Sequence, residues 1–150
     1  MAKTSYMALA LEQAEAAAKA GEVPVGAVLV EAGSGAVLAR DHNRVEELSD
    51  PTAHAEMLVI RAAARRLGMK RLIATDLYVT LEPCAMCAQA IAFARLRRLY
   101  FGAYDPKGGG VEHGAVVFRQ PTCHHRPEVV GGVEETRCGD LLRGFFRDRR

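Results

Sequence analysis

Apolar residues along this chain follow two alternating spacings, which predict helices separated by buried strands. Between Met7 and Ala18 they recur every three or four residues, as on one face of a helix. From Val23 to Val30 they are continuous and rich in valine, which is typical of a strand covered on both faces. The same alternation continues along the chain. It predicts an α/β fold of three layers, with helices on both faces of a central sheet.

Capping and turn residues set the expected boundaries. Thr4 or Ser5 can cap the first helix and Gly21 can end it, while Asp50-Pro51 and Glu82-Pro83 each place an acidic residue before a proline, a common way to open a helix. We expect helices at 5–20, 50–67, 82–95 and 134–149, and strands at 23–30, 36–40, 77–81 and 99–102. A polar loop is expected at 41–49 and a glycine-rich loop at 105–114. Short apolar pieces lie at 116–118 and 129–130, and the second of these is expected to form a fifth strand.

The composition is that of an ordinary globular protein. The 150 residues are 49% hydrophobic and 25% charged, and no repeat or linker divides them, so we expect one domain over residues 1–150. The net charge of +2 does not by itself call for a nucleic-acid partner. No apolar run is long enough to cross a bilayer, and no apolar signal core follows the start. We therefore expect a cytoplasmic protein without a membrane or DNA partner.

Two short motifs carry the most specific chemistry. His54, in His-Ala-Glu, and Cys84 and Cys87, in Pro-Cys-Ala-Met-Cys, offer one imidazole and two thiolates, which are preferred zinc ligands. A catalytic zinc keeps its fourth position for water, and Glu56 stands where a carboxylate can carry the proton of that water. Together the motifs are the signature of zinc nucleobase deaminases. We expect one Zn²⁺ per chain, with Glu56 as the catalytic residue.

The predicted elements place both motifs at the starts of helices. Residues three apart share a helix face, so Cys84 and Cys87 can bind one ion. The partial positive charge of a helix N-terminus also stabilises thiolates. Two parallel strands preceding these helices bring both N-termini to the same edge of the sheet, where open α/β sheets bind ligands.

Other uses of the cysteines stay open. A Cys-x-x-Cys pair alone is more often a structural half-site or a redox pair, and a structural zinc needs a fourth protein ligand. The candidates for that ligand are Cys123, His124, His125 and Cys138. Cys138 lies on the apolar stripe of the last predicted helix, which favours core packing. The Cys123-His124-His125 segment is therefore the more serious candidate for a fourth ligand, and its role stays open.

At these residues the chain closely resembles the bacterial tRNA-specific adenosine deaminases, a branch of the cytidine deaminase superfamily. The resemblance covers nearly the whole length and is most specific at residues 22–28, 50–56 and 77–87, with further matches at 101–105 and 145–147. It implies a cytidine-deaminase-like α/β/α fold with a mixed five-stranded sheet. It also implies a homodimer that converts the wobble adenosine of an arginine tRNA anticodon to inosine, with the target base flipped out of the loop.

The resemblance further implies substrate-binding residues. Asn43 is expected to hold the target nucleotide, Val25 to line the purine pocket and Asp105 to contact the nucleotide. Read without the resemblance, these three are a turn asparagine, a core valine and a loop-capping aspartate. The remaining candidates for substrate contact are Ala55, Lys107, Phe146 and Arg147, with Arg149 and Arg150 in the same tail.

Two competing functions stay open. The chain can be a deaminase of a free base or nucleoside such as guanine, cytosine or cytidine, in which case its C-terminal segment closes the pocket. It can also be a zinc-stabilised RNA-binding module without catalysis, although such a module has no need of Glu56. The alanine-rich helix carrying Met86, Ile91 and Phe93 is a candidate dimer interface, with burial in the monomer as the plainer interpretation.

Overall fold

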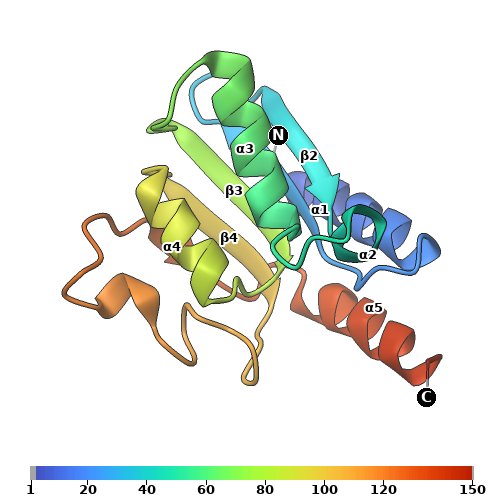
Figure 1. Ribbon diagram of the computed structural model, residues 1–150. Coiled ribbons are helices and arrows are strands. Elements are labelled where there is room, and N and C mark those ends of the chain that lie inside the picture. Colours follow the sequence, from blue (N-terminus) through green and yellow to red (C-terminus); the bar gives the residue numbers. More distant parts are fainter. Residues whose placement is uncertain (1–2, 150) are drawn as a thin grey trace.

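A five-stranded mixed sheet forms the centre of the computed structural model, which describes residues 3–149 (Figure 1). Its strands lie side by side in the order β2 (Val37–His42), β1 (Gly26–Glu31), β3 (Thr75–Leu81), β4 (Arg98–Ala103) and β5 (Glu128–Val130). Strand β1 is antiparallel to both β2 and β3, whereas β3, β4 and β5 are parallel. The predicted mixed sheet, including its fifth strand, is confirmed.

Helices cover both faces of this sheet. Helices α3 (Ala55–Leu67) and α4 (Ala85–Phe93) lie on the near face in Figure 1, and α1 (Lys3–Lys19) lies behind. The sheet separates two apolar cores, one under α3 and α4 and one on the opposite face. Helix α5 (Glu135–Arg147) packs with α1 in the core on that opposite face. Within β3, Leu77 and Val79 point into the core under α3 and α4, while Tyr78 points into the other. This division of alternate residues gives the expected three layers.

The direction of the strands brings two helix starts together. Strands β2 and β3 are not neighbours, but both are antiparallel to β1 and therefore run in the same direction. Helix α3 follows β2 and α4 follows β3 along the chain. Consequently the N-termini of α3 and α4 lie at the same edge of the sheet, as the sequence predicted.

Several predicted boundaries are wrong. The helices expected from residues 50 and 82 begin at Ala55 and Ala85. Asp50 instead accepts hydrogen bonds from the N–H and the hydroxyl of Thr52 in a turn. The first helix already includes Ser5, which is therefore not its cap, and the Thr4 side chain lies outside the described part. The apolar run from residue 23 becomes a strand only at Gly26, because Pro24 has no N–H for the sheet and the Val25 N–H donates locally to the Val23 carbonyl at 2.8 Å.

Two segments expected to be irregular contain helical turns. The polar segment 41–49 holds the end of β2 and a short helix α2 (Val45–Leu48), and the apolar piece near residue 117 is a 3₁₀ turn, η1 (Val117–Arg119). The start of α2 depends on Glu22, whose carboxylate accepts the N–H groups of Glu46 and Glu47. A partner this distant in sequence leaves no local signal.

Helix α5 packs directly on β4 at a glycine. A β-carbon at Gly102 would overlap Cys138 Sγ and would lie 2.7 Å from the Thr80 carbonyl oxygen. The absence of a side chain therefore lets Cys138 contact the sheet. Among the described residues, no helix has both the length and the apolar character needed to span a membrane.

Candidate active site

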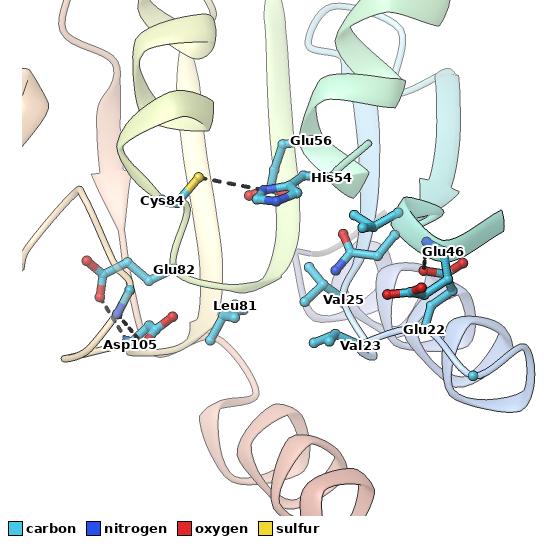
Figure 2. Close-up of a pocket in the computed structure, with 14 residues that line it drawn as sticks. Glu22, Val23, Val25, Glu46, His54, Glu56, Leu81, Glu82, Cys84 and Asp105 are labelled. Carbon is cyan, nitrogen blue, oxygen red and sulfur yellow. Dashed lines mark hydrogen bonds between the residues drawn. The ribbon is translucent and has the colours of Figure 1, made fainter. Parts of the chain in front are cut away.

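Three zinc-type donor atoms meet where α3 and α4 begin. His54 is the N-cap residue of α3 and Cys84 that of α4, and neither uses its side chain to cap its helix. Both side chains are thus free to turn toward each other, as Figure 2 shows. His54 Nδ1 lies 3.6 Å from Cys84 Sγ and 3.5 Å from Cys87 Sγ. The three donor atoms all lie within 4.8 Å of one another.

These distances fit a tetrahedral zinc site. A nitrogen at about 2.05 Å and a sulfur at about 2.3 Å from one zinc ion, separated by the tetrahedral angle, lie about 3.6 Å apart. Among residues 3–149, no other histidine, cysteine or carboxylate joins the group. His54, Cys84 and Cys87 could therefore hold a zinc ion through three protein ligands, which leaves a fourth position, as in a catalytic site.

The pKa shifts of His54, Cys84 and Cys87 also favour a metal site. Hydrogen bonds from the Cys87 thiol and from the His54 ring lower the pKa of Cys84 to about 4, although burial opposes them. The thiolate thus formed, together with burial, raises the pKa of Cys87. Hydrogen bonding to Cys84 raises the pKa of His54. Protons shared among close sulfur and nitrogen atoms are what a bound dication displaces, since metal ligands must be deprotonated.

Glu56 lies beside this cluster in the first turn of α3. Its side chain is almost fully buried yet lines the pocket next to His54 (Figure 2). Burial raises the pKa of Glu56 to about 7, and hydrogen bonding to its backbone N–H and the His54 charge only partly offset this. A carboxyl group with a pKa near neutrality can both accept and return a proton, as general acid–base chemistry requires.

A cavity of about 360 Å³ opens in front of these groups. Three residues expected to contact the substrate, Val25, Asn43 and Asp105, line it together with His54 and Glu56. Val25 also belongs to the apolar core under α3, so it serves both the core and the cavity. Asp105 Oδ1 accepts the N–H groups of Lys107 and Gly108, so Asp105 caps its own loop as well.

Asn43 is held in a fixed orientation. Its Oδ1 accepts the N–H of Ala55 at 2.8 Å, and its own backbone N–H donates to the Val25 carbonyl at 3.1 Å. Because the carbonyl end of the amide is occupied, the NH₂ group is left for the pocket. Ala55 itself is buried and is not among the residues that line the cavity; its described contribution is this backbone contact.

A second hollow adjoins the first. It shares Val23, Leu81, Asp105 and Gly108 with the main cavity and adds Lys107 and Phe146, which were expected to contact substrate. Phe146 is half exposed, and Arg143 stands beside it. Arg147 is exposed but is not among the residues that line either hollow. Arg150 lies outside the described residues.

The four candidates for a fourth zinc ligand are used elsewhere or lie apart from the cluster. Cys123 donates to the His125 carbonyl, and the His125 ring bonds the Leu96 carbonyl. Cys138, on α5, is buried against β4, and His124 is exposed. Within the described chain these residues do not complete a four-ligand structural site.

Sequence reasoning missed several residues that line the cavity. The most informative are the buried glutamates Glu22 and Glu82. Glu82 was expected to open a helix but instead binds the loop that begins at Asp105. A signal was present, since each glutamate is a lone charge next to an apolar strand and within two residues of a proline.

Comparison with known proteins agrees with this geometry. The sequence model of the cytidine and deoxycytidylate deaminase zinc-binding region matches residues 1–103. The tRNA-specific adenosine deaminase of Agrobacterium fabrum is 57% identical over 148 residues, covering 99% of this chain and 96% of that protein. The relative of the same name from Bacillus subtilis is 47% identical, covering 97% of this chain and 89% of that protein.

A solved structure supports the same family assignment. A structure from work on A-to-I editing by tRNA:A34 deaminases is 57% identical, with a TM-score of 0.90, covering 93% of this chain and all of the other. The sequence match with the Agrobacterium fabrum relative covers 99% of the chain and therefore extends past residue 103 to the loop and helix that line the second hollow. The chain belongs to the tRNA-specific adenosine deaminases, hydrolytic enzymes within the zinc-binding cytidine and deoxycytidylate deaminase group.

Proposed function

We propose that this chain removes the exocyclic amine of the wobble adenosine in a tRNA anticodon loop, that of an arginine tRNA, and forms inosine and ammonia. The observation that carries the proposal is the position of Glu56, buried beside three converging zinc-type ligands at one cavity. His54, Cys84 and Cys87 hold one Zn²⁺ in this proposal. The ion, when bound, supplies water that is activated at neutral pH.

The proton transfers fall to Glu56. Its carboxylate takes a proton from the attacking water and delivers it to the neighbouring ring nitrogen of the base. Once the water oxygen has bonded to the ring carbon, Glu56 takes the remaining proton from that oxygen and passes it to the amine. The C–N bond then breaks, ammonia leaves and the ring carbon keeps the oxygen as a carbonyl. Burial raises the pKa of Glu56 above that of an exposed glutamate, which makes it easier for this side chain to hold a proton between the two transfers.

Adenosine recognition in this proposal rests on the cavity wall. The amide NH₂ of Asn43 is the free donor of a side chain whose oxygen is already bound by the Ala55 N–H. Val25 provides an apolar surface for the flat base, and Asp105 an acceptor. An adenine must leave its stack to reach this depth, and unstacking costs only a few kcal/mol in a loop.

The second hollow supports an RNA substrate over a free base. A free base needs one cavity, whereas an anticodon loop brings neighbouring nucleotides with it. Phe146 offers a face for stacking, while Lys107 and the tail residue Arg147 offer charges for phosphates. Free-base deaminases remain the second candidate, because a guanine deaminase from Nitrosomonas europaea has the same fold at a TM-score of 0.84 and 25% identity.

A direct assay decides between them. Zinc-loaded protein is incubated with the anticodon stem-loop of an arginine tRNA and, separately, with adenosine, guanine, cytosine and cytidine, and inosine and ammonia are measured. A stem-loop with guanosine at the wobble position is the matched control. We expect inosine from the adenosine stem-loop alone. Turnover of the small compounds without the stem-loop would overturn the tRNA assignment.

We also propose that the protein is cytoplasmic, because tRNA editing needs access to tRNA, and that it forms a homodimer through α4. On α4, Ile91 is buried in the monomer core, but Phe93 is 73% exposed. An exposed phenylalanine on an alanine-rich helix suits an interface between two copies. Light scattering of the protein and of Phe93→Asp tests this, and a wild-type monomer at micromolar concentration would contradict it.

A further inference from the structure

Two buried glutamates hold the opposite walls of the cavity. Figure 2 shows Glu82 and Asp105 on one side of it and Glu22 and Glu46 on the other. Both glutamates line the cavity, and each is 2% exposed. Neither is a candidate zinc ligand, since the donor cluster contains only His54 and the two cysteines within the described chain.

Glu82 binds one loop almost entirely through backbone groups. Its Oε1 accepts the Asp105 N–H at 3.0 Å and pairs with the His113 ring at 2.8 Å. Its Oε2 accepts the N–H groups of Val111 at 3.2 Å, Glu112 at 2.9 Å and His113 at 3.2 Å. A carboxylate with this many donors is a specific receptor for one conformation of the loop.

The loop approaches Glu82 so closely that it needs glycine. A β-carbon at Gly109 would overlap Glu82 Oε2 and would lie 2.6 Å from the Asp105 carbonyl oxygen. The neighbouring residues Asp105 and Gly108 form the cavity wall. The position of that wall is therefore set by Glu82, which is anchored just after β3 and two residues before Cys84.

Glu22 does the same on the opposite side with fewer bonds. Its Oε1 accepts the Glu46 N–H at 3.0 Å, and its Oε2 accepts the Glu47 N–H at 2.8 Å. These bonds fix the short helix α2, from which Val45 and Glu46 line the cavity. Glu22 makes two hydrogen bonds to its wall and Glu82 makes five, so Glu22 is the weaker anchor.

We propose that Glu82 and Glu22 are positioning residues, which hold the two walls at the spacing that fits the flipped nucleotide. This inference rests on the proposed function for the identity of the substrate. Neither residue exchanges protons with the substrate in this scheme. Loss of either one lowers affinity for the substrate more than it lowers the rate of the chemical step.

Asp76 provides a matched control near the opposite end of β3. It is also a buried carboxylate, but it lies near the start of β3, away from the cavity, and pairs with the Arg97 side chain at 2.6 and 2.9 Å. A change at Asp76 therefore tests the general cost of losing a buried carboxylate. A change at Glu82 adds the effect on the cavity wall.

The test compares Glu82→Gln, Glu22→Gln and Asp76→Asn with wild type on the adenosine stem-loop, after zinc content and thermal unfolding are measured. For Glu82→Gln we expect KM to rise about tenfold and kcat to change less than about twofold. For Glu22→Gln we expect a rise in KM of about threefold. Asp76→Asn should leave KM unchanged even if its unfolding temperature falls, since its remaining folded molecules have a native cavity.

Two further measurements separate position from charge and from general stability. Glu82→Asp keeps the charge but is one methylene too short, so its KM should stay raised; a wild-type KM would overturn the proposal. Amide hydrogen exchange over residues 105–114 should speed up at least about tenfold in Glu82→Gln.

An unchanged KM in Glu82→Gln, or a fall in kcat alone, would also overturn the proposal that Glu82 positions the cavity wall. A wild-type chain that deaminates no RNA would instead refute the proposed function, and the exchange result would still show whether Glu82 holds the loop.

Discussion

The inner end of the cavity and its mouth are built in different ways. At the inner end, His54, Glu56, Cys84 and Cys87 come from two short segments, each at the start of a helix. The mouth combines parts of four segments that are distant in sequence, namely residues 21–25, 43–46, 105–108 and 142–146. Two helix starts place the first set. Long-range hydrogen bonds join the first three segments of the mouth to their partners, and packing of α5 on the sheet places the fourth.

This difference separates chemistry from recognition. Damage at the inner end should abolish turnover on every substrate, because it removes the groups that act on the reacting atoms. Damage at the mouth should leave the chemistry intact and change how well the RNA is held. Variants at the inner end should therefore lower kcat, whereas variants at the mouth should raise KM.

Loss of the metal should cause the largest change. We expect chelated protein and Cys87→Ser to lose activity by more than about 10³-fold, because the activated water is lost. Zinc should restore the chelated wild type but not the variant. Zinc content by mass spectrometry and ammonia release are the measurements. Cys123→Ser is the control, since Cys123 bonds the His125 carbonyl outside the cluster. Full activity in verified metal-free protein would contradict the prediction.

Glu56→Ala should keep its zinc and lose kcat by about 10³-fold or more, because general acid–base groups contribute up to about 10⁴-fold. Steady-state kinetics and metal analysis of the same sample test this. Glu135→Ala, which changes an exposed carboxylate on α5, should behave as wild type. Normal turnover in metal-loaded Glu56→Ala would refute the catalytic role.

Phe146→Ala should raise KM for the stem-loop by about tenfold and leave kcat nearly unchanged, since base–aromatic stacking is worth about 1–3 kcal/mol. Phe146→Leu keeps an apolar side chain without the aromatic face. A raised KM in both variants supports stacking on a base. A wild-type KM in Phe146→Leu would show that apolar packing suffices.

Lys107→Ala should have the smallest effect, a rise in KM of a few fold that disappears at high salt. One phosphate contact fewer should reduce the slope of log affinity against log salt concentration by about 0.7. Binding titrations at several salt concentrations measure that slope. Lys19→Ala, at the end of α1, is the control with the same charge change. An unchanged slope in Lys107→Ala would argue against a phosphate contact.

The fold and the convergence of the site could be predicted from sequence because their signals are local. The apolar strands, the helical spacing around Cys84 and Cys87, and the turn glycines each follow from a few adjacent residues. The meeting of His54 with the cysteines needed only the direction of β2 and β3. The predicted roles of these residues remain predictions, although the structure brings their side chains together.

The mouth could not be predicted because its anchors are distant in sequence. Helix α2 needs Glu22, more than twenty residues earlier, and the loop from Asp105 needs Glu82. The two helix starts were misplaced for different reasons. Aspartate or glutamate before proline is a local capping signal, but Asp50 bonds Thr52 in a competing local turn. Glu82 instead turns to the distant loop, so a long-range bond overrides the capping preference only there.

Gly102 makes the placement of α5 depend on one buried residue. Even an alanine there would overlap Cys138 Sγ on α5 and crowd the Thr80 carbonyl oxygen on β3, so the helix or the sheet would have to shift. Phe146, two turns further along α5, lines the second hollow and would move with the helix. Variation at this single position, whether by evolution or by protein engineering, is therefore expected to reshape that hollow.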